Sequence, residues 1–306
     1  MPSGPQSKVR GPVSPVVPTS YVIITPVRNE QDHLPRTIGS VVAQTVEPRV
    51  WMIVNDGSTD ATAQVIDRAA GNHGWIHTFH RQDRGFRQPG TGVIAAFYDG
   101  FRRLDNLQWD FLIKLDADLS FERDYFERCF RHFEDQPRLG IAGGTIYRQT
   151  DRGWVVDSPE DPPFHVRGAT KIYRRACWDQ IGGLIQAPGW DTVDELKANM
   201  SGWRTCTFPE LMLHQHKETG SADGTWRNWV KNGLANYVAG YHPLFMLAKC
   251  LRRLARRPFV MGAAGLWWGF CQGYIRNVRR VEDADLIRYV RHQQLNKLMF
   301  RPSLWL

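Results

Sequence analysis

Hydrophobic strands alternate with helical stretches along the first part of the chain, and this alternation is the feature that most restricts its fold. YVIITPV at 21–27 and WMIVNDGSTD at 51–60 are read as strands, the second ending in polar residues. Helical spacing of apolar residues covers 34–46, and 61–70 follows as a second helix. Such alternation builds βαβ units and a parallel sheet covered on both faces. The sequence therefore predicts an α/β domain with a mostly parallel sheet.

Polar residues follow three of the expected strands. Val27–Glu30 come after the first strand, Asn55–Asp60 after the second, and Asp116–Ser120 after the apolar run Phe111–Leu115. Open α/β sheets bind their ligands beside the carboxyl ends of the strands. We therefore expect the three clusters to converge on one crevice.

The pair Asp116 and Asp118 is costly at the end of a buried strand unless something offsets its charge. Two carboxylates one residue apart can hold Mg²⁺ or Mn²⁺, and these ions commonly bridge to substrate phosphates. The alternative is a turn in which Asp118 caps the following helix. The position at a strand end favours a metal site, where the ion would stabilise a departing diphosphate.

Three motifs follow one another in this sequence: TPVRNE at 25–30, VNDGSTDAT at 54–62 and LDADLS at 115–120. In this order they resemble the nucleotide-sugar domain of family 2 glycosyltransferases, over roughly residues 21 to 216. The resemblance implies the GT-A fold, a nucleotide-sugar donor and inversion at the anomeric carbon. It favours a UDP-sugar, with GDP and dTDP as alternatives.

The resemblance also implies roles for individual residues. Asp116 and Asp118 would carry the metal beside the diphosphate. The expected nucleotide-sugar ligands are Thr25, Pro26, Arg28, Glu30, Asp56, Arg84 and Asp116. Arg84 lies in a basic, glycine-containing loop at 80–92 that either contacts phosphates or the nucleobase, or is simply solvated. Asp60 is either a ligand or the cap of the next helix, a position open also to Ser58 and Thr59.

A sugar transfer needs a base near the acceptor hydroxyl, because an alcohol is a weak nucleophile until its proton is taken. GWDTVDELKANMSGW at 189–203 is the candidate stretch. Family members carry a Glu-Asp pair here, which places Asp191 as the base and Trp190 where Glu is usual. Asp194 and Glu195 give a competing alignment. Alternatively, one of the two aspartates only caps the helix that follows.

LMLHQHKETG at 211–220 follows another expected strand. His214 and His216 would point to the same side of an extended segment. By resemblance one of them completes the metal site, and neutral imidazole suits Mn²⁺. The alternative is a structural role for both.

Charge is distributed unevenly along the chain. Residues 1–244 carry 27 Lys and Arg against 28 Asp and Glu, whereas residues 245–306 carry 12 against 3. A neutral body argues against nucleic-acid binding, and a basic tail favours an anionic membrane surface. Within 256–276 lie 18 consecutive uncharged residues, with Trp267 and Trp268 among them. This predicts an interfacial or re-entrant helix, the alternative being a helix packed on the catalytic domain.

We expect a disordered lead-in at 1–20, a catalytic domain at 21–218 and a basic, Trp-rich helical extension at 219–306. Five cysteines without a C-x-x-C pair indicate a reducing compartment. Together these features predict a cytoplasmic enzyme on the inner face of the membrane, acting on a glycan or lipid-linked acceptor in exopolysaccharide or cell-envelope synthesis. One alternative is a nucleotidyltransferase, although it would need a Gly-rich basic loop where TPVRNE stands. The other is an inactive membrane-associated scaffold of the same fold.

Overall fold

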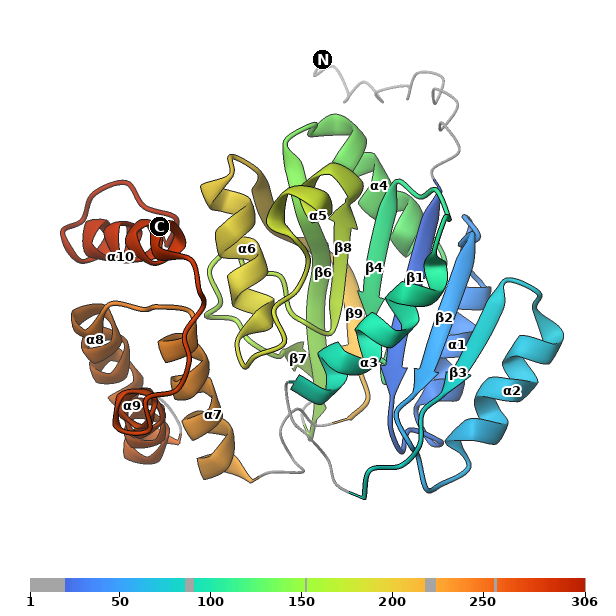
Figure 1. Cartoon of the computed structure of the whole chain (residues 1–306), viewed down its shortest axis with the longest axis horizontal. Coiled ribbons are helices and arrows are strands. Elements are labelled where there is room, and N and C mark those ends of the chain that lie inside the picture. The colour runs from blue at the N-terminus through green and yellow to red at the C-terminus, as the bar shows by residue number, and fades with distance from the viewer. Residues whose placement is uncertain (1–19, 86–90, 152, 218–223, 256–257, 306) are drawn as a thin grey trace, which may run out of the picture.

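One mixed sheet crosses the body of the molecule, with helices against both of its faces (Figure 1). The structure, a computed structural model, describes residues 20–85, 91–151, 153–217, 224–255 and 258–305. Within these ranges nine strands pair in the order β3-β2-β1-β4-β8-β6-β9-β5, and β7 pairs with β6. The expected lead-in, apart from Ser20, and Arg87 of the basic loop lie outside the described residues.

The strands follow the alternation expected from the sequence over the first half of the chain. They are β1 (Tyr21–Val27), β2 (Val50–Asn55), β3 (Ile76–His80), β4 (Phe111–Leu115), β5 (Leu119–Phe121), β6 (Leu139–Thr150), β7 (Gly153–Val156), β8 (Thr170–Arg174) and β9 (Arg204–Gln215). The helices are α1 (Leu34–Val42), α2 (Thr62–Asn72), α3 (Thr91–Phe101), α4 (Tyr125–Asp135), α5 (Arg175–Ile181), α6 (Trp190–Met200), α7 (Thr225–Val238), α8 (Pro243–Leu254), α9 (Phe259–Ile275) and α10 (Ala284–Leu298).

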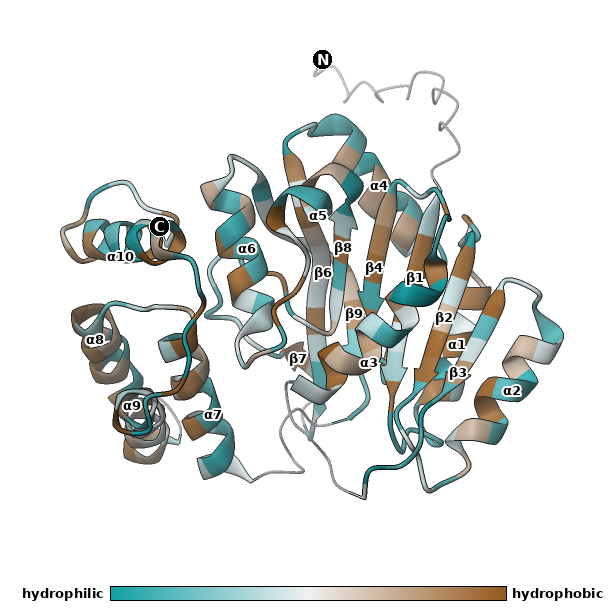
Figure 2. Cartoon of the chain, viewed as in Figure 1, coloured by the Kyte–Doolittle hydropathy of each residue, from teal (hydrophilic) through white to brown (hydrophobic). Residues whose placement is uncertain are grey.

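The central strands are apolar on both sides because both faces of the sheet are covered, and Figure 2 shows hydrophobic residues along them. Successive residues of a strand point to opposite faces. Ile23 therefore joins a core with residues of α1, α2 and α4, whereas Ile24 joins a second core with residues of α3, α5 and α6. Helices α1, α2 and α4 thus cover one face of the sheet, and α3, α5 and α6 cover the other.

Strand β8 interrupts the parallel pairing of the sheet. Strands β3, β2, β1 and β4 run parallel, but β8 pairs antiparallel with both β4 and β6. β6 and β7 are joined by two residues, a connection that permits only antiparallel pairing. β6 and β9 run parallel again, so the expected mostly parallel α/β sheet is present, and the three polar clusters follow β1, β2 and β4.

Several element boundaries differ from those expected. The helix that Asp118 could have capped begins only at Tyr125, because residues 119–121 pair with β9 as the short strand β5. Ala61 is the N-cap of α2 instead of Ser58, Thr59 or Asp60. Asp60 Oδ1 still accepts a hydrogen bond from the Thr62 N–H at 3.0 Å, so its carboxylate shapes the turn before the helix.

Helices α7 to α10 form the extension, which lies beside α6 at the end of the molecule far from α2 (Figure 1). A third core joins the extension to the catalytic domain, since Val193 and Leu196 of α6 are buried with Tyr237, Met246 and Phe270. In the described part of the chain, no helix has both the length and the hydropathy needed to cross a bilayer.

The backbones of α7 and α9 are in direct contact. A β-carbon added at Gly269 of α9 would collide with the carbonyl oxygen of Val230, and one at Gly233 of α7 would collide with that of Leu266. One face of α9 is therefore committed to packing within the protein, which matches the packed alternative for this face.

Candidate functional site

The loops after β1 and β2 hold each other in place. Asn29, at a φ of 54°, accepts the Thr59 N–H on its Oδ1 at 2.8 Å, and its own N–H donates to Ser58 Oγ at 3.0 Å. The Glu30 N–H donates to Thr62 Oγ1 at 2.8 Å, and Asp60 Oδ2 accepts from a neighbouring backbone N–H. Most polar side chains of the two motifs therefore fix the loops, and Asp60 has this structural role.

Asp56 lies between two arginines at this edge. Its Oδ1 accepts from Arg81 and its Oδ2 from Arg84, each at 2.5 Å, while Arg28 donates to its backbone oxygen at 2.5 Å. Gly57 follows with a φ of +69°, and any β-carbon there would collide with the backbone of Asp83. The motif thus places a carboxylate among guanidinium groups, and these groups can bind a nucleobase, a ribose or a phosphate.

Two of the residues expected to contact the donor belong to the core. Thr25 is fully buried, and its Oγ1 accepts a hydrogen bond from the indole N–H of Trp51 at 2.9 Å. Pro26 is buried within β1, beyond Ile24, the last residue that pairs with β4. Because both faces of this strand are covered, both side chains are buried, and a contact of either residue with the donor stays a prediction.

The aspartate pair after β4 is held by protein groups that differ from those expected. Lys114, 2% exposed, donates to Asp116 Oδ1 and, at 2.5 Å, to the carbonyl oxygen of Gly168. Asp118 Oδ2 accepts from Gln215 Nε2 at 3.0 Å. The sequence signal for the partner of Asp116 was Lys114 itself, a lysine within the otherwise apolar run 111–115.

One carboxylate oxygen at this pair lacks a partner. Asp118 Oδ1 is buried and has no hydrogen bond within the described ranges, and the same holds for Glu30 Oε2. Burial, with the charges of Asp116 and Glu30, raises the pKa of Asp118 to about 7. Lys217 binds the other Glu30 oxygen at 2.6 Å. An unpartnered oxygen among carboxylates fits a hard divalent cation, which would replace the missing positive charge.

The histidines do not complete a metal site in the described structure. His216 contacts Ser120 Oγ through its Nε2 at 2.8 Å, and the His214 ring lies 4.4 Å from that of Trp154. No three His, Cys, Asp or Glu side chains in the described residues are grouped closely enough to hold a metal. Alternation along the segment points Gln215 toward Asp118, and a ligand role for His214 or His216 stays a prediction.

Two buried lysines lie side by side beneath Trp190. Lys114 of β4 and Lys171 of β8 are directly opposite in the antiparallel pairing, so their side chains share one face. Their ammonium groups lie 5.3 and 5.7 Å from the centre of the Trp190 ring. We call this arrangement the lysine pair. Each lysine has its own acidic partners, which offsets the repulsion between them.

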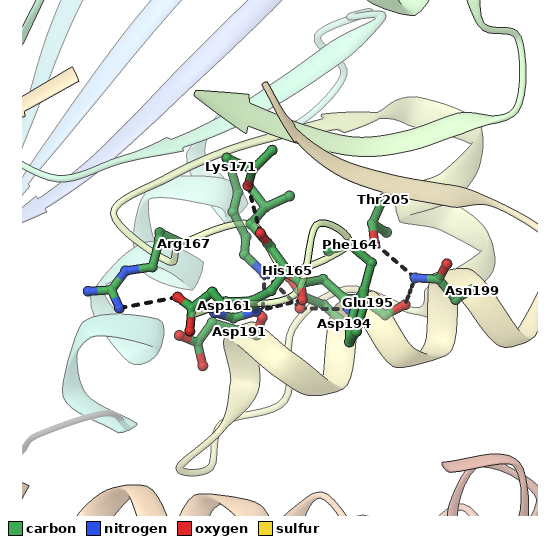
Figure 3. A network of polar contacts seen from close by, with 12 residues as sticks. Asp161, Phe164, His165, Arg167, Lys171, Asp191, Asp194, Glu195, Asn199 and Thr205 are labelled. Atoms are coloured by element: carbon green, nitrogen blue, oxygen red, sulfur yellow. Dashed lines mark hydrogen bonds and ion pairs between the residues drawn. The ribbon is translucent and has the colours of Figure 1, made fainter. Parts of the chain in front are cut away.

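Lys171 is the centre of the network in Figure 3. Its ammonium donates to both carboxylate oxygens of Asp194 at 2.9 Å, to Glu195 Oε1 at 2.7 Å and to the backbone oxygen of Asp191 at 2.5 Å. Lys171, Asp194 and Glu195 have fully buried side chains. The first turn of α6 is therefore fixed on β8 by charge-assisted hydrogen bonds.

The two candidate bases have very different surroundings. Asp194 is buried and also accepts from Tyr173 OH at 2.6 Å; burial raises its pKa to about 6. Asp191 is half-buried, and its Oδ2 would lie 3.2 Å from a β-carbon placed on Gly168. Gly168 is the residue whose carbonyl binds Lys114, so the Asp191 carboxylate lies beside the segment that supports the aspartate pair. Asp194 is placed as a structural carboxylate, contrary to the competing alignment.

His165 adds a titratable group to this network. Its Nδ1 lies 2.8 Å from Glu195 Oε2, and Asp161 approaches its Nε2 at 3.9 Å. Burial alone would lower the pKa of His165, but the charges of Glu195 and Asp161 outweigh it and raise the pKa above its usual value. Folding therefore favours the protonated form of His165 more than the unfolded chain does.

We expect His165→Gln to change the pH dependence of stability. A histidine whose pKa is raised on folding stabilises the protein fully below its unfolded pKa of about 6.5, and this contribution is lost as pH rises through the folded value. Thermal unfolding from acidic to alkaline pH should show a variant less stable at low pH, with the difference shrinking as pH increases. His132→Gln, at a surface pair with Glu210, is the control. Parallel curves for His165→Gln and wild type would contradict the assignment.

Comparisons with known proteins agree with this arrangement. The model of the family "Glycosyl transferase family 2" matches residues 22–186. Poly-beta-1,6-N-acetyl-D-glucosamine synthase of Staphylococcus aureus (strain MSSA476) is 28% identical over 116 residues, which are 38% of this chain and 26% of that protein. Glycosyltransferase GlyA of Streptococcus pneumoniae is 27% identical over 135 residues, 43% of this chain and 17% of GlyA. The match thus spans only 26% and 17% of the length of these two relatives.

Solved structures show the same fold at low identity. The mannosyltransferase PcManGT from Pyrobaculum calidifontis, in complex with GDP-Man and Mn²⁺, aligns with a TM-score of 0.56 and 17% identity over 90% of this chain and 79% of that one. S. aureus TarS 1-349 in complex with UDP-GlcNAc aligns at 0.53 and 14%, over 91% and 81%. The expected GT-A fold is confirmed. Because the family match covers more than half of its length, the chain belongs to glycosyl transferase family 2.

Proposed function

We propose that the chain is a metal-dependent, inverting glycosyltransferase that moves a sugar from a nucleoside diphosphate sugar to an acceptor hydroxyl. The observation that carries the proposal is the buried Asp118 oxygen that has no partner within the described ranges, close to Asp116 after β4. The Asp191 carboxylate lies beside Gly168, the residue whose carbonyl oxygen binds Lys114. Sugar transfer needs a cation beside the donor diphosphate and a base beside the acceptor hydroxyl. We assign the first role to Asp116 and Asp118 and the second to Asp191.

The donor would lie along the ends of β1, β2 and β4. Asp56 accepts hydrogen bonds from the nucleoside, while Arg28 and Arg84 are available to its phosphates once they exchange their present partners. UDP is the favoured nucleotide, and S. aureus TarS 1-349 has been solved in complex with UDP-GlcNAc. GDP is the main alternative, since PcManGT is in complex with GDP-Man.

Asp116 and Asp118 would hold a Mg²⁺ or Mn²⁺ ion, with Glu30 nearby and further oxygens supplied by the diphosphate. The ion would stabilise the negative charge that develops on the departing diphosphate. Lys114 keeps Asp116 at the edge of the sheet, and Gln215 orients Asp118 so that its second oxygen remains available.

Asp191 would act on the acceptor side as the general base. It takes the proton of the acceptor hydroxyl while that oxygen attacks the anomeric carbon from the face opposite the diphosphate, so the C–O bond to the diphosphate breaks with inversion. Lys171 positions Asp191 by binding its backbone oxygen. The acceptor class we propose is a glycan or lipid-linked glycan of an extracellular polysaccharide or cell envelope, following the named activity of the Staphylococcus aureus relative.

Thermal shift with a panel of UDP-, GDP- and dTDP-sugars, with and without Mn²⁺, tests the donor and metal assignment. A ligand that binds only the native state raises its apparent stability by mass action, by about 2.7 kcal/mol at a hundred times its Kd. We expect a shift that requires both one nucleotide class and the metal. A folded protein that shifts with no pair would favour the inactive scaffold, and a shift with free nucleoside triphosphates alone would favour a nucleotidyltransferase.

Asp118→Asn is expected to separate stability from metal use. The variant should lose the metal-dependent shift and metal-dependent turnover, because a neutral amide is a poor ligand for a hard cation. The metal-free protein should become more stable by about 1 kcal/mol, because a charged, partly unsatisfied buried group is removed. Asp67→Asn on the exposed face of α2 is the matched control and should change neither property. Full metal-dependent activity in Asp118→Asn would overturn the metal site.

A further inference from the structure

Helix α8 presents an apolar stripe to solvent. The stripe consists of leucines at positions three or four apart, which lie on one face of a helix. These are Leu244, Leu247, Leu251 and Leu254, with exposed fractions of 58, 44, 58 and 42%. The opposite face is satisfied, since Met246 and Cys250 are buried in the third core. The stripe therefore has no partner in the described fold, and Figure 2 shows the hydrophobic character of α8 at this end of the molecule.

Helix α9, which packs on α8, has a second outward apolar face. Its glycine face packs against α7. No residue of the helix is charged, so its outward face carries no charge. Exposed apolar side chains on it are Phe259, Val260, Met261, Trp267, Trp268 and Ile275. Soluble monomers rarely expose contiguous apolar patches larger than a few hundred Å². We call the leucine stripe and this face together the apolar surface of the extension.

Positive charge accompanies this surface. Arg252 is exposed on α8, and Arg276 and Arg279 are exposed just beyond the end of α9. Arg280 stacks on the rings of Tyr237 and Tyr274 at 4.3 and 4.7 Å, and its buried Nε has no hydrogen-bond partner within the described ranges. These two tyrosines, Arg279 and Arg280 line a cavity of about 510 Å³.

We propose that α8 and α9 dock the enzyme on an anionic phospholipid membrane, with their apolar surface at the boundary between headgroups and acyl chains and a lipid phosphate at the arginine-lined cavity. Interfacial helices of this kind combine Leu and Trp on one side with Lys and Arg on the other. Charge decides against a second copy of the chain as the occupant, because residues 245–306 carry 12 basic against 3 acidic residues and two such surfaces repel each other.

The mode of docking differs from that expected for a re-entrant segment. α9 cannot enter the bilayer alone, because its glycine face is in backbone contact with α7. Docking therefore uses one face of a folded helical layer and leaves the extension intact. This inference stands apart from the proposed transfer reaction, since it rests on no residue of the candidate site.

Flotation of the full-length protein with vesicles tests the proposal. Vesicles of phosphatidylcholine with phosphatidylglycerol should bind the wild type, and vesicles of phosphatidylcholine alone should bind it much less. The double variant Leu247→Gln/Leu251→Gln should bind at least about tenfold more weakly, because each buried leucine contributes on the order of a tenfold change in affinity. The control is Val42→Gln/Met212→Gln, two exposed apolar positions of the catalytic domain, which should bind like wild type.

A second pair of variants tests the phosphate site. Arg279→Gln/Arg280→Gln should reduce the preference for phosphatidylglycerol and make vesicle binding less sensitive to salt. Inorganic phosphate at millimolar concentration should not displace the wild type from vesicles, because free phosphate does not compete with the apolar surface. Equal vesicle binding by the leucine variant and the wild type would overturn the proposal. So would the absence of binding to anionic vesicles, or a wild-type dimer in light scattering that the leucine substitutions convert to a monomer.

Discussion

Replacing Lys171 by methionine is expected to lower the free energy of unfolding by about 3–5 kcal/mol, the usual cost of removing one partner from a buried ion pair. Methionine fills a similar volume, so the loss comes from electrostatics rather than from a cavity. Asp194 and Glu195 would remain in the interior without their ammonium partner, and His165 would still lie 2.8 Å from Glu195 (Figure 3). Urea unfolding of both proteins measures the difference.

The lysine pair supplies its own control. Lys114→Met leaves Asp116 without its ammonium partner, but 30% of that side chain is exposed and the carboxylate can be hydrated. Its loss of stability should be less than half of that caused by Lys171→Met. Adding Asp194→Asn and Glu195→Gln to Lys171→Met should recover part of the lost stability, because the buried negative charges are removed as well. Equal losses for the two lysine variants would contradict this account.

Asp191→Asn is expected to reduce the rate of sugar transfer by about 10²–10⁴-fold, the range typical of a lost general base. The donor-induced thermal shift should remain, because Asp191 lies on the acceptor side of the site and the backbone oxygen that binds Lys171 is unchanged. Initial rates with a saturating donor, together with the thermal shift of the same preparation, separate catalysis from binding.

Asp194→Asn is the comparison that identifies the base. It should lower stability, because Lys171 and Tyr173 lose a charged acceptor, while transfer by the folded protein is affected much less. If Asp194→Asn loses transfer with intact donor binding and Asp191→Asn does not, the base lies one turn further along α6 and our placement of Asp191 is wrong.

The sequence was sufficient for elements whose signal is local. The apolar run at 111–115 and the polar ends of β1 and β2 were placed correctly, because burial and turn chemistry act within a few residues. Strand β5 was missed, since three residues carry no periodicity of their own and depend on pairing with β9. The antiparallel pairing of β8 with β4 and β6 was missed for the same reason.

The site was predicted less completely than the fold. Thr25 was read as a ligand because it begins a family motif, but which strand face meets Trp51 depends on distant packing. Gln215 was overlooked between two histidines, although the alternation that aligns His214 with His216 also sends Gln215 the other way. The lysine pair was visible only as isolated charges, because Lys114 and Lys171 meet through a register that no local pattern specifies.

Helix α6 has one side in the core of the sheet and the other in the third core, and it begins at a junction with the extension. Trp190 lies in the second core, with Ile24 of the sheet, whereas Val193 lies in the third core. At the start of the helix, a β-carbon on Gly189 would lie 3.0 Å from the carbonyl oxygen of Ala235 on α7. Opening the extension would therefore strip one wall from the helix that carries Asp191, so the two halves form a single cooperative folding unit. The extension is therefore packed as a structural part of this domain, and a chain cut at residue 244 would lose Met246 and Phe270 from the third core as well as the surface proposed to bind a membrane.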